Sequence, residues 1–254
     1  MISKIILCAC FATATLSAYT QAKKTTTVVK SNQHLRVFDK AMLSGDAGTA
    51  TIALNYYLAE QGSNTSYADT LAMLYMQQGA YPQCYYWTQL RLLTNPDDNN
   101  LLELKGICLD KLQQSKEAID VFEKLFKKTQ NPYHAYKLME LQYGMKRLNE
   151  CLQTAMVAEQ LTYKPSHIMT YNVGQQVGRT YLQAGVYNIH ALALYDLDKK
   201  AEAKTYFEKA LALDTSFALA KQNLQAVISI ENGGTKTSTG PVLQQGASPA
   251  LKQN

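Results

Sequence analysis

A short phrase recurs about every 34 residues along this chain. Its copies are GAYPQCYYWTQLRLLTNP, QSKEAIDVFEKLFKKTQNP and KKAEAKTYFEKALALDTSF. One small residue opens the second half of each repeated unit, and these residues follow one another at steps of 34, 34, 33 and 52: Ala50, Cys84, Ala118, Cys151 and Ala203. A fixed period in this range indicates a repeat architecture, in which similar units stack on one another. The period therefore constrains the fold more than any single motif does.

Each unit has the apolar spacing of two helices joined by a turn. Apolar residues at i, i+3, i+4 and i+7 indicate helices, and glycine-containing turns at Ser44-Gly45-Asp46 and Gly79-Ala80 separate the halves of the first two units. A further amphipathic stretch, 215–230, is expected to cover the last apolar face, which a stacked array would otherwise leave exposed. The expected helix pairs span residues 31–60, 66–93, 99–128, 132–161 and 182–213.

These units resemble the tetratricopeptide repeat, whose pattern is Trp-x2-Leu-Gly-x2-Tyr in the first helix and Ala-x3-Phe in the second. The third and fifth units carry the resemblance best, whereas the first and fourth are weak copies. The resemblance implies an all-α fold over residues 31–231, a right-handed α-solenoid of about five helix pairs plus a C-terminal capping helix. The matching residues are Leu102, Gly106, Leu109, Ala118 and Phe122 in the third unit, and Tyr187, Ala191, Leu194, Ala203 and Phe207 in the fifth.

One step of 52 exceeds the period by 18 residues, which marks an insertion at about 164–183. The helical spacing is lost there, and β-branched and aromatic residues flank Gly174. Three structures are compatible with this stretch: a β-hairpin, an irregular extended loop, or an early start of the fifth helix near Val177. Long insertions in compact domains are often functional, so we expect this one to contribute to function.

The two ends of the chain differ in composition from the repeats. Residues 1–22 combine a basic residue, an apolar run and small residues at the end, which is typical of a cleaved signal peptide. Lipidation at Cys10 is the alternative. Residues 23–30 are expected to be a linker, and the Gly-, Ser-, Thr- and Gln-rich residues 232–254 are expected to be disordered. We therefore expect an exported, periplasmic bacterial protein, with no membrane span because no later stretch reaches 18 apolar residues.

The sequence contains no pattern that indicates catalysis, a metal site or a cofactor. The four histidines lack the spacing of metal ligands, and no Gly-x-Ser-x-Gly elbow is present. The formal net charge of +5 is carried without runs of like charge, so nucleic-acid binding is not expected. The cysteines after residue 22 are expected to pack as small apolar residues; a Cys84–Cys108 disulfide bridge is the alternative. The sequence thus predicts a protein that is not an enzyme.

In the family that the units resemble, the first helix of each pair lines the concave face. Transferred to this chain, the resemblance implies a groove in which acids, aromatic rings and methionine interleave. Such a surface is adaptable, and its acids favour a basic or N–H-rich segment. The alternative is that these are only the half-buried positions of their helices. The candidate partner-binding residues are Asp69, Met73, Glu103, Ile107, Asp110, Tyr133, Tyr136, Glu140, Tyr143, Asn188 and Tyr195.

The predicted function is protein or peptide binding, by a scaffold or assembly factor of the cell envelope whose concave groove takes a partner segment. One alternative is a structural subunit that docks by its convex or end surfaces. Another is a module that faces the cell wall or a carbohydrate, suggested by the 17 tyrosines. Some members of the family hold an acidic peptide terminus with a carboxylate clamp of Lys, Asn and Arg on the concave face. Acids and tyrosines predominate on that face here, so an acidic C-terminus is not the expected ligand.

Overall fold

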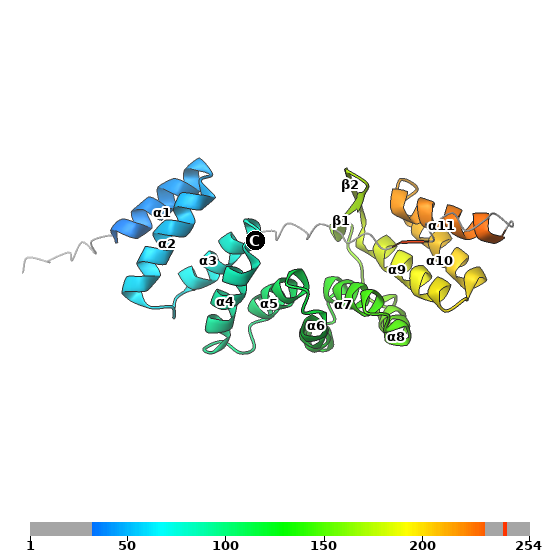
Figure 1. Cartoon of the computed structure of the whole chain (residues 1–254), viewed down its shortest axis with the longest axis horizontal. Coiled ribbons are helices and arrows are strands. Elements are labelled where there is room, and N and C mark those ends of the chain that lie inside the picture. Colours follow the sequence, from blue (N-terminus) through cyan, green and yellow to red (C-terminus); the bar gives the residue numbers. More distant parts are fainter. Residues whose placement is uncertain (1–31, 232–240, 243–254) are drawn as a thin grey trace, which may run out of the picture.

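The computed structural model describes residues 32–231 and 241–242. Over these residues the helices follow an arc, and a short β-hairpin stands on its inner side (Figure 1). The predicted signal peptide, the linker, Cys10 and most of the predicted disordered tail lie outside the described residues. Within the described part, no helix combines the length and the apolar character needed to cross a bilayer.

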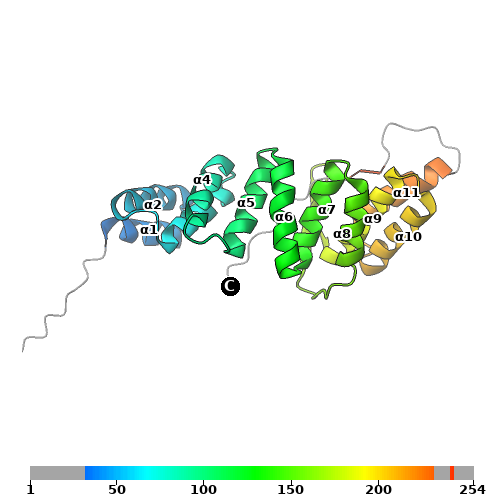
Figure 2. The same cartoon turned by 90° about the horizontal axis from the view of Figure 1, so that it is seen from below.

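Five helix pairs and one final helix make up the arc. Consecutive helices pack against one another along the described chain, and Figure 2 shows α5 to α8 standing side by side. The boundaries of the helices, given at the end of this paragraph, agree with the predicted helix pairs. The predicted α-solenoid with a capping helix is therefore confirmed. The pairs are α1 (Gln33–Ser44) with α2 (Ala47–Gln61), α3 (Ser66–Gln77) with α4 (Tyr81–Leu92), α5 (Asn99–Lys111) with α6 (Ser115–Thr129), α7 (Pro132–Gly144) with α8 (Leu148–Ala158), and α9 (Leu182–Asp196) with α10 (Lys200–Leu213), followed by α11 (Ala218–Glu231).

The turn inside each pair repeats with the same period as the sequence. In every unit one turn residue has a positive φ, and the next residue donates its N–H to the carbonyl five positions earlier, as Gln114 does to Leu109 at 2.8 Å. Glycine adopts this left-handed conformation without steric cost, whereas other residues are strained there. The first two units use glycine and the last three do not: the residues are Gly45, Gly79, Gln113, Lys146 and Asp198.

Small residues allow the two helices of a pair to approach closely. The five small residues that define the period are all fully buried. Gly106 shows how tight the packing is, because a Cβ there would lie 2.7 Å from Cε2 of Phe122. The ring of Phe122 is itself fully buried in the core that extends from α5 to α11. A side chain larger than hydrogen at position 106 therefore has no room.

The three described cysteines are free and buried, as expected of small apolar residues. Cys84 of α4 and Cys108 of α5 contact each other, and the hydrogen bond with Cys84, together with burial, raises the pKa of Cys108. Burial also raises the pKa of Cys151, to about 12. The alternative of a Cys84–Cys108 disulfide is wrong, because both cysteines are free thiols that pack against each other.

The insertion folds as an antiparallel hairpin of β1 (Ile168–Val173) and β2 (Gln176–Tyr181). Val173 pairs with Gln176, and Gly174 of the two-residue turn has a φ of +59°, which glycine adopts freely. Of the three predicted alternatives the hairpin is correct, and the irregular loop and the early helix are wrong.

Candidate functional site

The inner side of the arc is lined by the first helix of each pair and by α11 (Figure 1). Starting from Asp69 on α3, one polar residue recurs on each inner helix at steps of 34, 34, 51 and 35 residues. The step of 51 spans the hairpin insertion, so the residues occupy equivalent positions of successive units. We call this set the inner-face column; its members are Asp69, Glu103, Lys137, Asn188 and Asn223.

Asp69 is held by an arginine from the outer helix of its own unit. Arg91 of α4 donates from Nε to Oδ1 of Asp69 at 2.6 Å and from Nη2 to Oδ2 at 3.2 Å. The hydrogen bond with Asp69 raises the pKa of Arg91, whose side chain is 8% exposed. A forked pair of this kind fixes both partners. The carboxylate of Asp69 is thus largely occupied within the unit.

A buried group of charges joins α5 to α7. Lys137 donates from Nζ to Oδ2 of Asp110 at 3.2 Å and also to Oε2 of Glu140, and Nε2 of His134 lies 2.9 Å from Oε2 of Glu103. Burial alone would lower the pKa of Lys137, but the carboxylates of Glu140 and Asp110 outweigh it and raise that pKa. We call these five residues the α5–α7 charge cluster. It sets three carboxylates against one lysine and one histidine.

Tyr133 lies beside this cluster with a buried hydroxyl that has no hydrogen-bond partner among the described residues. Burial raises its pKa, Lys137 lowers it, and the nearby carboxylates raise it further. A buried polar atom without a partner is costly. The hydroxyl is therefore a buried group whose hydrogen-bonding capacity is unused among the described residues.

The other aromatic candidates on α7 contribute to packing. Tyr136 is 6% exposed, and its ring lies 3.1 Å from the position that a Cβ on Gly185 of α9 would take. Met169 of the hairpin lies against the same glycine. Tyr143 is also buried. The ring of Tyr136 fills the space between α7, α9 and β1, and the ring of Tyr143 is buried near Asp196 of α9, so neither ring is on a surface that a partner can reach.

The remaining candidates divide by exposure. Met73 on α3 and Tyr195 on α9 are half-buried, and a partner can contact them. Ile107 is 3% exposed and belongs to the core. The predicted set of binding residues thus contains both accessible and structural side chains.

Asn188 and Asn223 form the C-terminal end of the inner-face column, and Asn223 binds the main chain of Val242. Nδ2 of Asn223 donates to Oδ1 of Asn188 at 3.0 Å and to the carbonyl of Val242 at 3.2 Å. Oδ1 of Asn223 accepts the N–H of Val242 at 2.9 Å. The N–H and C=O of one residue point the same way in extended backbone, as in the paired residues of an antiparallel sheet. Asn223 therefore binds the main chain of Val242 through both of its hydrogen-bonding groups.

Four residues that sequence reasoning did not select complete the inner face. Each is the partner of a selected residue: Arg91 of Asp69, His134 of Glu103, Lys137 of Asp110 and Glu140, and Asn223 of Asn188. The sequence period could have identified two of these four residues. Lys137 follows Glu103 by one step, and Asn223 follows Asn188 by nearly one step.

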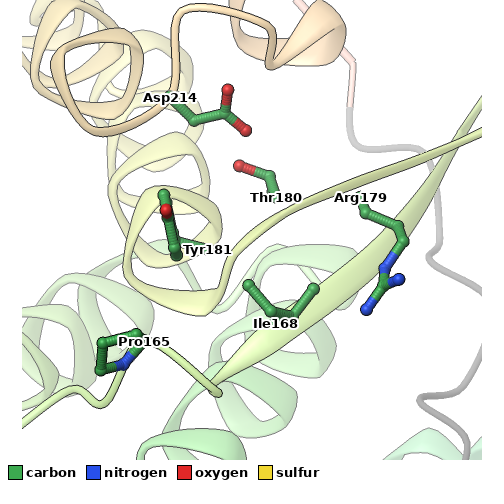
Figure 3. Close-up of a pocket in the computed structure, with 6 residues that line it drawn as sticks. All are labelled: Pro165, Ile168, Arg179, Thr180, Tyr181 and Asp214. Carbon is green, nitrogen blue, oxygen red and sulfur yellow. The ribbon is translucent and has the colours of Figure 1, made fainter.

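A pocket of about 420 Å³ opens at the base of the hairpin. Figure 3 shows the hydroxyl of Thr180 facing the carboxylate of Asp214, with Arg179 extending away from it. Burial alone would raise the pKa of Asp214, but the hydroxyls of Ser216 and Thr180 outweigh it and lower that pKa. Within the described residues, no group of histidine, cysteine and acidic side chains is arranged to hold a metal ion. The pocket is lined by Pro165, Ile168, Arg179, Thr180, Tyr181 and Asp214.

Comparison with known proteins identifies the class of fold. Residues 184–217, which comprise most of α9, all of α10 and the turn to Phe217, match the family model of the tetratricopeptide repeat. A comparison with curated protein sequences gives no match. The predicted resemblance is therefore confirmed at the fifth helix pair.

Solved structures extend this likeness to most of the chain. A crystal structure of MamA is 18% identical, covers 73% of this chain and 92% of its own, and has a TM-score of 0.59. MamA from Desulfovibrio magneticus RS-1 is 15% identical, with 72% and 94% covered and a TM-score of 0.58. YrrB, described as a TPR protein with an unusual peptide-binding site, is 13% identical, with 74% and 89% covered and a TM-score of 0.59. This protein has the fold of a tetratricopeptide-repeat α-solenoid.

Proposed function

We propose that this protein is a non-enzymatic scaffold or assembly factor that binds an extended segment of a partner protein along its inner face. The observation that carries the proposal is the pair of hydrogen bonds between Asn223 and the main chain of Val242. A side-chain amide placed in this way accepts any segment that presents an extended main chain. The peptide-binding site named for YrrB, which has a similar fold, is consistent with this use of the inner face.

The charges of the inner face favour a particular partner chemistry. The α5–α7 charge cluster has one carboxylate more than its cationic side chains, even when His134 is protonated, and Tyr133 adds an unpaired hydroxyl. A segment that carries N–H donors or a basic side chain would pair with the least buried carboxylates of this cluster, Glu103 and Asp110. We therefore propose a partner segment that is extended and basic or rich in N–H donors.

The proposed setting is the bacterial cell envelope, which the protein reaches through its first 22 residues. Support for this comes from the composition of that segment. N-terminal sequencing of the protein recovered from an envelope fraction tests it. A mature chain that begins at Lys23 is the expected result, whereas a lipid-modified Cys10 would select the alternative.

A second function is favoured by exposed apolar side chains on the first helix pair. Leu43 is 89% exposed, Ile52 59% and Tyr56 61%, and solvent-facing apolar residues that gather on one unit often mark an interaction surface. They support the alternative in which the protein docks by its end surface. The tyrosines that suggested a carbohydrate-facing module are partly used in packing, since Tyr57 and Tyr67 pack on each other with ring centroids 5.1 Å apart.

Affinity capture of the partner from native envelope separates these functions. Three single variants are compared with the natural chain: Asn223→Ala on the inner face, Ile52→Glu on the end surface, and Met156→Glu, which is 66% exposed on the outer helix α8. We expect Asn223→Ala to reduce recovery at least fivefold, with unchanged helicity by circular dichroism, and the other two to leave recovery unchanged. Loss of the partner with Ile52→Glu, but not with Asn223→Ala, would establish end-surface docking instead.

A further inference from the structure

The chain returns to its own inner face after the last helix. α11 ends at Glu231, yet Val242 is hydrogen-bonded to Asn223 in the middle of that helix. We propose that the main chain at Val242 is an internal ligand of the Asn188–Asn223 site, which a partner segment must displace in order to bind there. The displacement rests on the proposed function; the internal binding does not.

The hydrogen bonds at this site leave no side-chain group of Asn223 unused. Both hydrogens of its amide are donated, one to Asn188 and one to the carbonyl of Val242, and its oxygen accepts the N–H of Val242. Asn188 and Asn223 are 2% and 1% exposed. Buried amides that lose a partner must find another one. When Val242 leaves, the site therefore takes water or another main chain.

The hydrogen bonds at this site engage the main chain of Val242 and not its side chain. The residue remains 40% exposed, although its N–H and C=O are both bound. A contact of this kind places few demands on residue type, apart from the need for a free N–H. An extended segment of a partner can therefore present the same two groups and compete directly with the tail.

The internal ligand is suited to being displaced. Two neutral hydrogen bonds give a small net stabilisation, and ordering the tail opposes it. The covalent connection between α11 and Val242 offsets this weak binding, because a linked segment has an effective concentration in the millimolar range. If the tail segment alone binds with a Kd of about 1 mM, the tether lowers the apparent affinity of any competitor by about three- to tenfold.

Titration of a synthetic peptide into the full-length chain tests the internal binding. The peptide STGPVLQQG copies residues 238–246, and its binding is followed by NMR at the side-chain amide of Asn223. Val242→Pro removes the N–H that Asn223 accepts, while Val242→Ala keeps the main chain and is the matched control. Asn223→Ala removes the site.

We expect the peptide to bind the Val242→Pro chain at least threefold more tightly than the natural chain or the Val242→Ala chain. Binding to the Asn223→Ala chain, followed at the remaining amide of Asn188, should be lost. Equal affinity for the natural, Val242→Pro and Val242→Ala chains would overturn the proposal. Peptide binding that survives Asn223→Ala would overturn it as well.

Capture of the partner from native envelope keeps this inference separate from the proposed function. If both hold, Val242→Pro increases recovery while Asn223→Ala reduces it at least fivefold. If the peptide titration succeeds and neither variant changes recovery, the tail binds and the proposed function is wrong. If the titration fails while Asn223→Ala still reduces recovery, the inner face binds a partner and the tail is not its internal ligand.

Discussion

Replacing Gly106 by alanine tests the close packing on which the arc depends. The added Cβ would lie 2.7, 3.1 and 3.2 Å from three ring carbons of Phe122, whereas carbon atoms pack best at about 3.5–4.0 Å. The ring is fully buried between helices and cannot swing into solvent. Either the ring or the α5–α6 pair must shift, and overpacking of this kind costs about 1–3 kcal/mol.

Alanine also has a favourable effect, which must be separated from the clash. It is a better helix former than glycine by about 1 kcal/mol, so the net destabilisation by Gly106→Ala is about 0–2 kcal/mol. Gly144, the last residue of α7, is the matched control, because nothing lies within 4 Å of the position that an added Cβ would take there. We expect Gly144→Ala to show the same gain in helix propensity, about 1 kcal/mol, without the clash, so the two alanine variants should differ by the overpacking cost of about 1–3 kcal/mol.

Thermal unfolding followed by circular dichroism at the helix band measures the difference. For a chain of this size, 1 kcal/mol shifts the Tm by about 2–4 °C, so the Gly106→Ala chain should melt about 2–12 °C below the Gly144→Ala chain. In a Phe122→Leu background the penalty at position 106 should largely disappear, since the ring that causes it is gone. If the two alanine variants have the same Tm, the proposed close packing between α5 and α6 at Gly106 is refuted.

Three further changes have defined outcomes. Gln113→Gly relieves an exposed non-glycine residue at a φ of +61° and should raise the free energy of unfolding by about 0.5–1 kcal/mol; a lower midpoint in urea would contradict this. Lys137→Met leaves the carboxylates of the buried Glu140 and the half-buried Asp110 without their cation and should cost about 3–5 kcal/mol at neutral pH. The raised pKa of Lys137 means that its stabilisation is complete below the unfolded-state pKa of about 10.4 and is lost as pH rises toward the folded-state value, so the alkaline loss of stability should be smaller in Lys137→Met. Tyr171→Phe removes the hydroxyl that accepts the N–H of Ala218 at 3.1 Å and should cost about 1 kcal/mol, with faster amide exchange in the hairpin; unchanged exchange would argue against that contact.

The period in the sequence predicts most of the fold because it records a local, repeated packing requirement. Every unit must place a small residue where its two helices meet, so Ala118 or Cys151 is visible without knowledge of the rest of the chain. The hairpin is also visible through its composition. The position of the hairpin against the helices cannot be predicted in this way. It depends on the contact of Tyr171 with Phe217, which joins the insertion to a turn two helices later and has no counterpart in the repeating pattern.

The inner face is less predictable from the sequence because its side chains pair with residues on other helices. Asp69 pairs with Arg91 on the outer helix, and no periodic pattern in the sequence links the two residues. In the fourth unit the step to Cys151 shortens to 33, and this hides the regular step from Glu103 to Lys137. Tyr136, one position earlier, is thereby selected as a groove residue although it packs in the core.

The C-terminal tail shows a different limit. Its composition predicts disorder, since it contains too few apolar residues to form a core. The two hydrogen bonds to Val242 use main-chain atoms only, and every residue except proline carries the same N–H and C=O groups. No property of the valine side chain distinguishes it from its neighbours as the residue bound by Asn223.

Photo-crosslinking in living cells tests most directly whether a partner occupies the inner face. A photoreactive residue is placed either at Met73, half-buried on α3, or at Met156, exposed on α8. The proposed function predicts that a partner segment is captured from position 73 and that position 156 captures none. Capture from position 156 with none from position 73 would contradict it.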